Sequence, residues 1–118
     1  MIVGIDNGLD GGLAFLGDDL TTMPMPTRKI GKGRVIDSIT VAELFKVYKP
    51  DLIALEEASK HSAGVLALCS TWRSFGKLET VIEMMRLPHE IVRPQTWQKT
   101  FWARPKMPKG TKFDTKAA

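Results

Sequence analysis

Two apolar segments of this 118-residue chain each end in a carboxylate. Residues 2–5 lead into Asp6, and residues 52–55 lead into Glu56. An acid beside a buried strand loses hydration, which is costly unless the acid is paired or binds a metal ion. Two such acids brought to one edge of a sheet would form the kind of divalent-metal site that supports phosphate chemistry.

That chemistry has a defined ligand requirement. Hydrolysis of a phosphodiester needs an activated water and a stabilised leaving oxygen, which two divalent ions about 3.5–4 Å apart supply. Mg²⁺ prefers carboxylate oxygens, so the scarcity of other ligands, two histidines and one cysteine, is no obstacle. Taken separately, Asp6 could instead cap a turn and Glu56 could pair with a lysine. Glu57 is the neighbouring alternative to Glu56, but strand alternation points it to the opposite face.

The surrounding pattern predicts an α/β fold with a mixed five-stranded sheet flanked by helices. The predicted strands are 1–6, 13–16, 20–23, 51–56 and 89–92, of which the first three form an antiparallel meander. One helix follows a capping box at Thr40 and Glu43, and a second spans 65–85, while 27–35 is predicted to be a basic loop. A strand reached through a helical crossover lies parallel to the first, so Asp6 and Glu56 should meet at one carboxyl edge.

The charge is unevenly placed along the chain, whose net charge is +4. Residues 93–118 hold seven Lys/Arg against one acid, whereas residues 1–92 hold ten against twelve. Two basic segments on a nearly neutral body suit a polyanion, although a solvated surface is the alternative. The candidate phosphate contacts are Arg28, Lys29, Lys32, Arg34, Lys99, Arg104, Lys106, Lys109 and Lys112. Gly8 would let a nucleic-acid backbone approach the turn after Asp6.

Length and composition limit the class of protein. The chain is expected to form one domain over 1–118. It has no apolar run of the roughly 20 residues that span a membrane and no basic segment of a secretory signal. A single cysteine, Cys69, allows no internal disulfide and is predicted to be a small buried side chain, which fits a reducing cytoplasm.

The motifs together resemble those of RuvC-type Holliday junction resolvases. The similar segments are 4–8 with 11–15, 53–56, 73–79 and 92–99. The resemblance implies an RNase-H-like fold, cleavage of branched DNA that depends on Mg²⁺ or Mn²⁺, and a homodimer bound to branched or double-stranded DNA. It also implies that Asp6 and Glu56 correspond to the first two catalytic carboxylates of that family.

The sequence departs from the family pattern at two places. Trp72 stands four positions before Gly76, where a small residue is common, and the chain ends at Ala118, ahead of the further acidic pair of the family's last helix. We therefore expect an incomplete metal site, weak Mg²⁺ binding, and junction cleavage that is poor or absent.

Two alternative functions follow from these departures. A non-catalytic nucleic-acid-binding or dimerising module with the same fold is the main one. Turns of the type Asp6-Asn7-Gly8 also occur in sugar kinases and actin-like ATPases, but those proteins need two domains, which 118 residues cannot hold.

Overall fold

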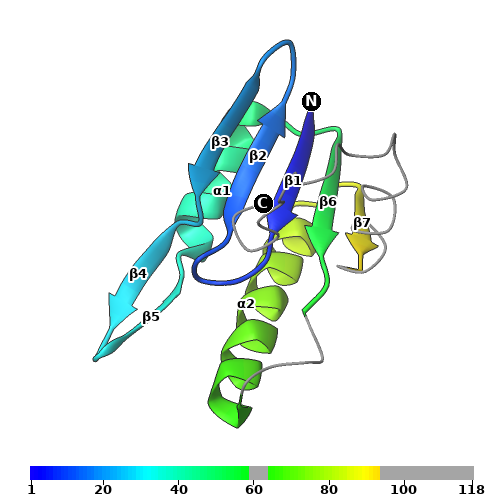
Figure 1. Cartoon of the computed structure of the whole chain (residues 1–118). Coiled ribbons are helices and arrows are strands. Elements are labelled where there is room, and N and C mark those ends of the chain that lie inside the picture. Colours follow the sequence, from blue (N-terminus) through cyan, green and yellow to red (C-terminus); the bar gives the residue numbers. More distant parts are fainter. Residues whose placement is uncertain (59–63, 94–118) are drawn as a thin grey trace, which may run out of the picture.

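Five strands form a mixed sheet in the computed structural model, which describes residues 1–58 and 64–93 (Figure 1). In sheet order they are β3 (Leu20–Pro24), β2 (Gly12–Leu16), β1 (Ile2–Asp6), β6 (Leu52–Glu56) and β7 (His89–Val92). The first three pair antiparallel, whereas β6 is parallel to β1 and β7 is parallel to β6. The predicted meander followed by parallel strands is confirmed.

A separate two-stranded hairpin extends from the body of the molecule (Figure 1). It consists of β4 (Thr27–Ile30) and β5 (Gly33–Ile36), so the predicted basic loop over 27–35 is wrong. Gly31 closes the tight turn with φ +57°, a conformation that glycine adopts without a Cβ penalty. The hairpin lacks an apolar alternation because most of its side chains are exposed, which is why the pattern indicated a loop.

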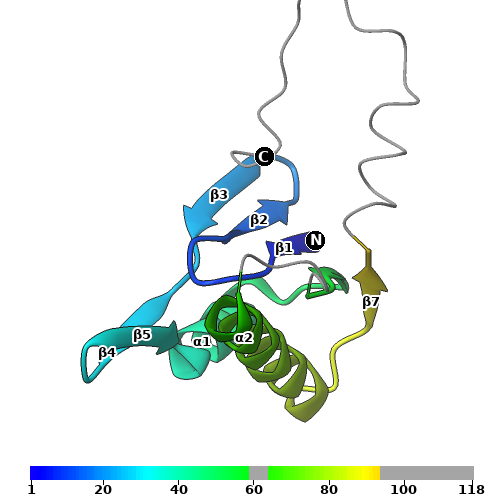
Figure 2. The same cartoon turned by 60° about the horizontal axis from the view of Figure 1, so that its bottom comes forward.

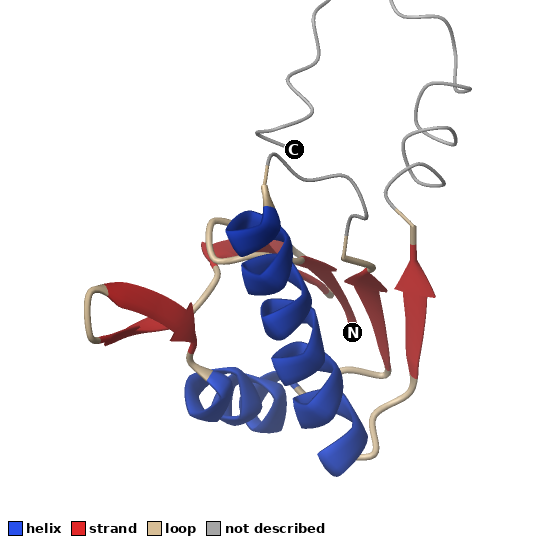
Figure 3. Ribbon diagram, turned by 90° about the horizontal axis from the view of Figure 1, so that it is seen from below, coloured by secondary structure: helices blue, strands red, loops and turns tan. Residues whose placement is uncertain are grey.

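Two helices lie on the same face of the sheet, as Figures 2 and 3 show. They are α1 (Ser38–Tyr48) and α2 (Val65–Met84). The cap of α1 is Asp37, whose carboxylate accepts hydrogen bonds from the backbone N–H and hydroxyl of Thr40. The predicted capping box, which began at Thr40, is therefore wrong: the helix begins at Ser38 and its cap is Asp37. Neither helix of the described ranges is long and apolar enough to cross a membrane.

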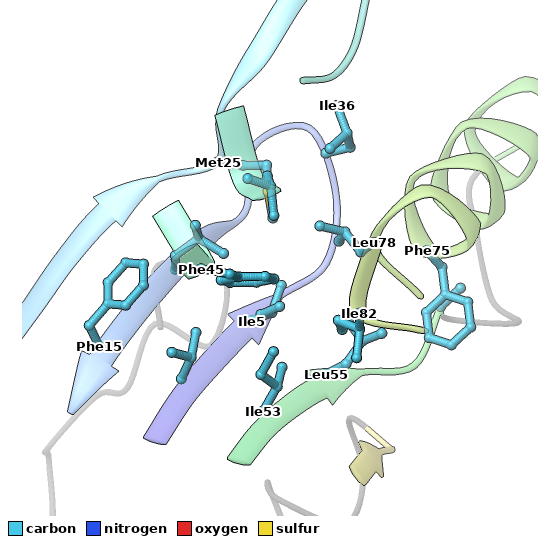
Figure 4. Close-up of a cluster of buried hydrophobic side chains, with 14 residues drawn as sticks. Ile5, Phe15, Met25, Ile36, Phe45, Ile53, Leu55, Phe75, Leu78 and Ile82 are labelled. Atoms are coloured by element: carbon cyan, nitrogen blue, oxygen red, sulfur yellow. The ribbon is translucent and has the colours of Figure 1, made fainter. Parts of the chain in front are cut away.

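The hydrophobic core fills the space between the helices and the sheet (Figure 4). Alternate strand residues point into it, because successive side chains of a strand face opposite sides. The buried strand residues are Val3, Ile5, Leu13, Phe15, Ile53 and Leu55, and the buried helix residues include Val41, Phe45, Phe75, Leu78 and Ile82. Since Ile5 and Leu55 face the helices, the residues that follow them face the other side of the sheet.

The N-terminal part of α2 extends beyond the sheet (Figure 1). Its first buried residue is Ser74, while Val65 and Leu66 are 76% and 86% exposed. Cys69 is exposed too, so the prediction that it is buried is wrong, because the side chains of α2 enter the core only from Ser74 onward. Trp72 stays 38% exposed, with its ring set edge-on to Phe75.

Candidate metal site and nucleic-acid surface

The parallel pairing of β1 with β6 brings Asp6 and Glu56 together. Ile5 and Leu55 are register partners, so the two acids occupy the next equivalent positions at the carboxyl ends of neighbouring strands. Their side chains form a hydrogen bond with each other. Carboxyl groups this close influence each other's protonation. A metal role for these two residues stays a prediction.

Burial raises the pKa of Asp6 above its ordinary value, and the hydrogen bond with Glu56 opposes part of that rise. The folded state therefore binds a proton at this site more tightly than the unfolded chain does. A divalent cation would compete with that proton, so metal affinity should fall as the pH drops through the raised pKa.

We expect Asp6→Asn to raise the melting temperature at pH 7. Because the folded pKa is raised, the ionised carboxylate destabilises the fold, and this cost sets in as the pH rises from about 3.8 to the folded pKa. The gain over wild type should thus disappear below the ordinary pKa of the side chain. Thermal unfolding between pH 3 and pH 8 measures it, with the exposed Asp18→Asn as control. A lower melting temperature than wild type at pH 7 would contradict the expectation.

The turn after β1, which directly follows Asp6, is held by backbone and side-chain hydrogen bonds. Gly8 has φ +121°, and the Gly11 N–H donates to its carbonyl oxygen at 3.1 Å. The side-chain amide of Asn7 donates to the carbonyl of Thr71 in α2 at 3.4 Å, which ties the turn to the helix. No atom of the described residues lies within 4 Å of where a Cβ of Gly8 would be, so the predicted approach of a nucleic-acid backbone has room beside them. The contact itself is still a prediction.

A broad hollow of about 770 Å³ opens onto the acid pair from the side of the sheet opposite the helices. Its floor is a row of small residues, because Gly4 pairs with Ala14 on one side and with Ala54 on the other. Asp6 and Glu56 line its end. The carboxylates are therefore accessible to a large ligand that lies across the sheet.

The donor set fits a hard divalent ion, though only in part. Carboxylate oxygens are the ligands that Mg²⁺ and Mn²⁺ prefer. Within residues 1–58 and 64–93, however, no group of three or more His, Cys, Asp or Glu side chains lies close enough to hold a metal ion. Glu57, the alternative to Glu56, instead lies with its carboxylate 3.6 Å from Nε of Arg93.

The predicted phosphate contacts fall into two groups. Arg28, Lys29, Lys32 and Arg34 are exposed on the β4–β5 hairpin, with Lys32 in its turn and the other three on its paired strands. Arg34 forms an ion pair of 2.6 Å with Asp10 of the turn after β1, a contact that the sequence pattern did not indicate. The remaining predicted contacts, Lys99, Arg104, Lys106, Lys109 and Lys112, lie outside the described residues.

Comparison with solved structures identifies the fold. The chain is similar to Thermus thermophilus RuvC in complex with a Holliday junction substrate, with a TM-score of 0.65 and 14% identity over 86% of this chain and 69% of that chain. A second Thermus thermophilus RuvC structure matches with a TM-score of 0.56 and 14% identity over 92% of this chain and 72% of that chain.

Comparisons of the amino-acid sequence with known proteins identify no related protein. No family model matches the sequence, and no curated protein matches it. The structural similarity shows that the chain has a RuvC-like, RNase-H-like fold, as the sequence motifs predicted.

Proposed function

We propose that this chain is a RuvC-like domain that binds branched DNA and holds a divalent metal ion at Asp6 and Glu56 for phosphodiester hydrolysis. The observation that carries the proposal is the hydrogen-bonded pair of acids at adjacent parallel strand ends. The pair lies on a fold similar to that of a RuvC structure solved in complex with a Holliday junction substrate.

In this proposal, Asp6 and Glu56 are the metal ligands of the chain. Asp6 and Glu56 would hold Mg²⁺ or Mn²⁺ through their carboxylate oxygens, with any proton on Asp6 competing against the metal ion. When bound, the ion supplies charge stabilisation and water activation for the attack on a phosphodiester. With two converging acids in the described part of the chain, we expect weak metal binding and slow hydrolysis.

A non-catalytic DNA-binding module is the second candidate function. It is favoured by the finding that, within the described residues, no third His, Cys, Asp or Glu joins Asp6 and Glu56.

A junction-binding assay followed by metal addition tests the two candidates. In EDTA, we expect a four-way junction to bind at least about tenfold more tightly than a linear duplex of the same sequence, a difference of about 1.4 kcal/mol. Addition of Mg²⁺ or Mn²⁺ should then produce slow nicking. Junction binding with no nicking at any metal concentration would favour the non-catalytic module. Equal affinity for junction and duplex would contradict selectivity for branched DNA.

We also propose that the chain acts as a homodimer through the exposed part of α2. Val65, Leu66 and Trp72 leave apolar surface on this helix without cover from the described elements. Apolar side chains gathered on one exposed helix favour association. Light scattering should give twice the chain mass, and a monomer mass at the concentrations used for DNA binding would contradict the proposal.

A further inference from the structure

A second hollow lies on the helix side of the acid pair. Two adjoining cavities of about 240 and 360 Å³ lie between the turn after β1, strand β5 and helix α2. They share Leu9, Arg34, Ser70 and Ser74 in their walls, so they form one continuous depression, here called the cationic groove. Asp6 lines one end of it and also lines the broad hollow over the open sheet face. The two spaces therefore adjoin at the turn after β1, where both are lined by Asp6, Asp10 and Gly11.

Three cations line the groove from two separate elements. Arg34 comes from β5, and Arg73 and Lys77 come from α2. α2 and β5 are in contact, and Figure 3 shows the hairpin on the same side of the sheet as α2. The hairpin thus forms one wall of the groove and the helix forms the other.

The arrangement of these charges is unfavourable without an anion. Arg73 and Lys77 are four residues apart on one helix, where like charges face each other and destabilise the helix. In the ranges that the structure describes, neither of them forms an ion pair. Arg34 does have a partner, Asp10, but that carboxylate is 90% exposed at the rim of the groove. A cluster of this kind is expected where an anionic ligand binds.

We propose that the cationic groove binds the backbone phosphates of the DNA strand whose neighbouring phosphodiester reaches Asp6 and Glu56. Arg34, Arg73 and Lys77 are the phosphate ligands, and the hydroxyl of Ser70 is a further donor from the wall. This inference rests on the proposed function, since it assumes that DNA is the ligand. It adds two residues of α2, Arg73 and Lys77, that the sequence analysis did not predict as phosphate contacts, and it assigns the hairpin the role of a groove wall.

In this arrangement, the Asp10 carboxylate competes with a DNA phosphate for the guanidinium of Arg34. A phosphate that enters the groove replaces the Asp10 carboxylate at the guanidinium of Arg34, where a two-point hydrogen bond to phosphate is favourable. Removal of the Asp10 charge should therefore strengthen DNA binding, in contrast to the usual loss of affinity after a substitution.

The test compares two double variants in junction binding at several salt concentrations. Arg73→Gln with Lys77→Gln removes one arginine and one lysine from the groove. Lys46→Gln with Arg86→Gln removes the same charges from exposed positions that do not line it. We expect the groove variant to bind about tenfold more weakly, with a log–log salt slope smaller by about 2. The control variant should stay within about twofold of wild type, and Asp10→Asn should bind several-fold more tightly.

The outcomes separate this inference from the proposed function. If wild type binds the junction but the groove variant matches the control variant, the groove assignment is wrong and junction binding stands. If the groove variant loses affinity and wild type never nicks DNA, the groove stands and the hydrolytic function falls. No junction binding by wild type would overturn both. Thermal unfolding of each variant checks the fold, and Asp10→Asn gives an independent readout because its expected effect is a gain.

Discussion

Asp6→Asn should abolish metal-dependent nicking of a four-way junction while junction binding in EDTA stays within about twofold of wild type. Asparagine keeps the size of the side chain but removes the negative charge that would attract a cation at the end of β1. A metal ion contributes several kcal/mol to the transition state of phosphodiester hydrolysis, which corresponds to a rate loss of at least about 100-fold. Glu56→Gln should give the same result, because its carboxylate shares the site.

The neighbouring acid supplies a matched control for this prediction. Glu57→Gln removes the same chemical group one residue further along the chain, where the carboxylate lies near Arg93 rather than Asp6. We expect it to nick DNA at the wild-type rate. Nicking that survives both Asp6→Asn and Glu56→Gln would show that the activity belongs to another site or to a contaminant. Loss of nicking in Glu57→Gln alone would move the metal site to that residue.

Metal binding can be measured without any cleavage. Titration of Mn²⁺, followed by its electron paramagnetic resonance signal, should show weak binding by wild type and none above background by Asp6→Asn. Affinity should also rise with pH through the raised pKa of Asp6, because the metal ion competes with the proton that binds Asp6. Tight binding by wild type would contradict the expectation that two acids make a weak site.

The convergence of Asp6 and Glu56 was predictable because it depends on topology alone. Two apolar segments that end in an acid, joined through a helical crossover, must place those acids at one sheet edge if the strands are parallel neighbours. The burial of Ile5 and Leu55 is explained by the same strand order together with strand alternation. These features need only the order of the elements and the period of two along a strand.

The contacts around the site could not be predicted in the same way. The bond between Asn7 and Thr71 and the ion pair between Asp10 and Arg34 join residues 64 and 24 positions apart. They depend on where the hairpin and α2 lie, and neither position follows from local propensity. The hairpin itself lacks the apolar alternation that identifies a strand, since most of its side chains are exposed.

Gly11→Ala should be the most damaging small substitution in the turn that carries Asp6. A Cβ at this position would overlap the carbonyl oxygen of Asp6 and lie 2.8 Å from its carbonyl carbon. Both atoms belong to the backbone, so the turn and the end of β1 must move to make room. We expect a loss of about 3 kcal/mol in the free energy of unfolding, which lowers the melting temperature by roughly 10 °C or more.

The same movement should reach the candidate site, since the displaced carbonyl belongs to Asp6 itself. Any metal-dependent nicking should fall in Gly11→Ala even at temperatures where the variant is folded. Gly76→Ala is the matched control: among residues 1–58 and 64–93 no atom lies within 4 Å of its Cβ position, and alanine favours a helix by about 0.5–1 kcal/mol over glycine. It should melt at or above the wild-type temperature. If Gly11→Ala melts and nicks like wild type, the turn after β1 can accommodate a Cβ without displacing Asp6. The positions of Asp6 and Glu56 would then depend on the register of β1 and β6 and not on this turn.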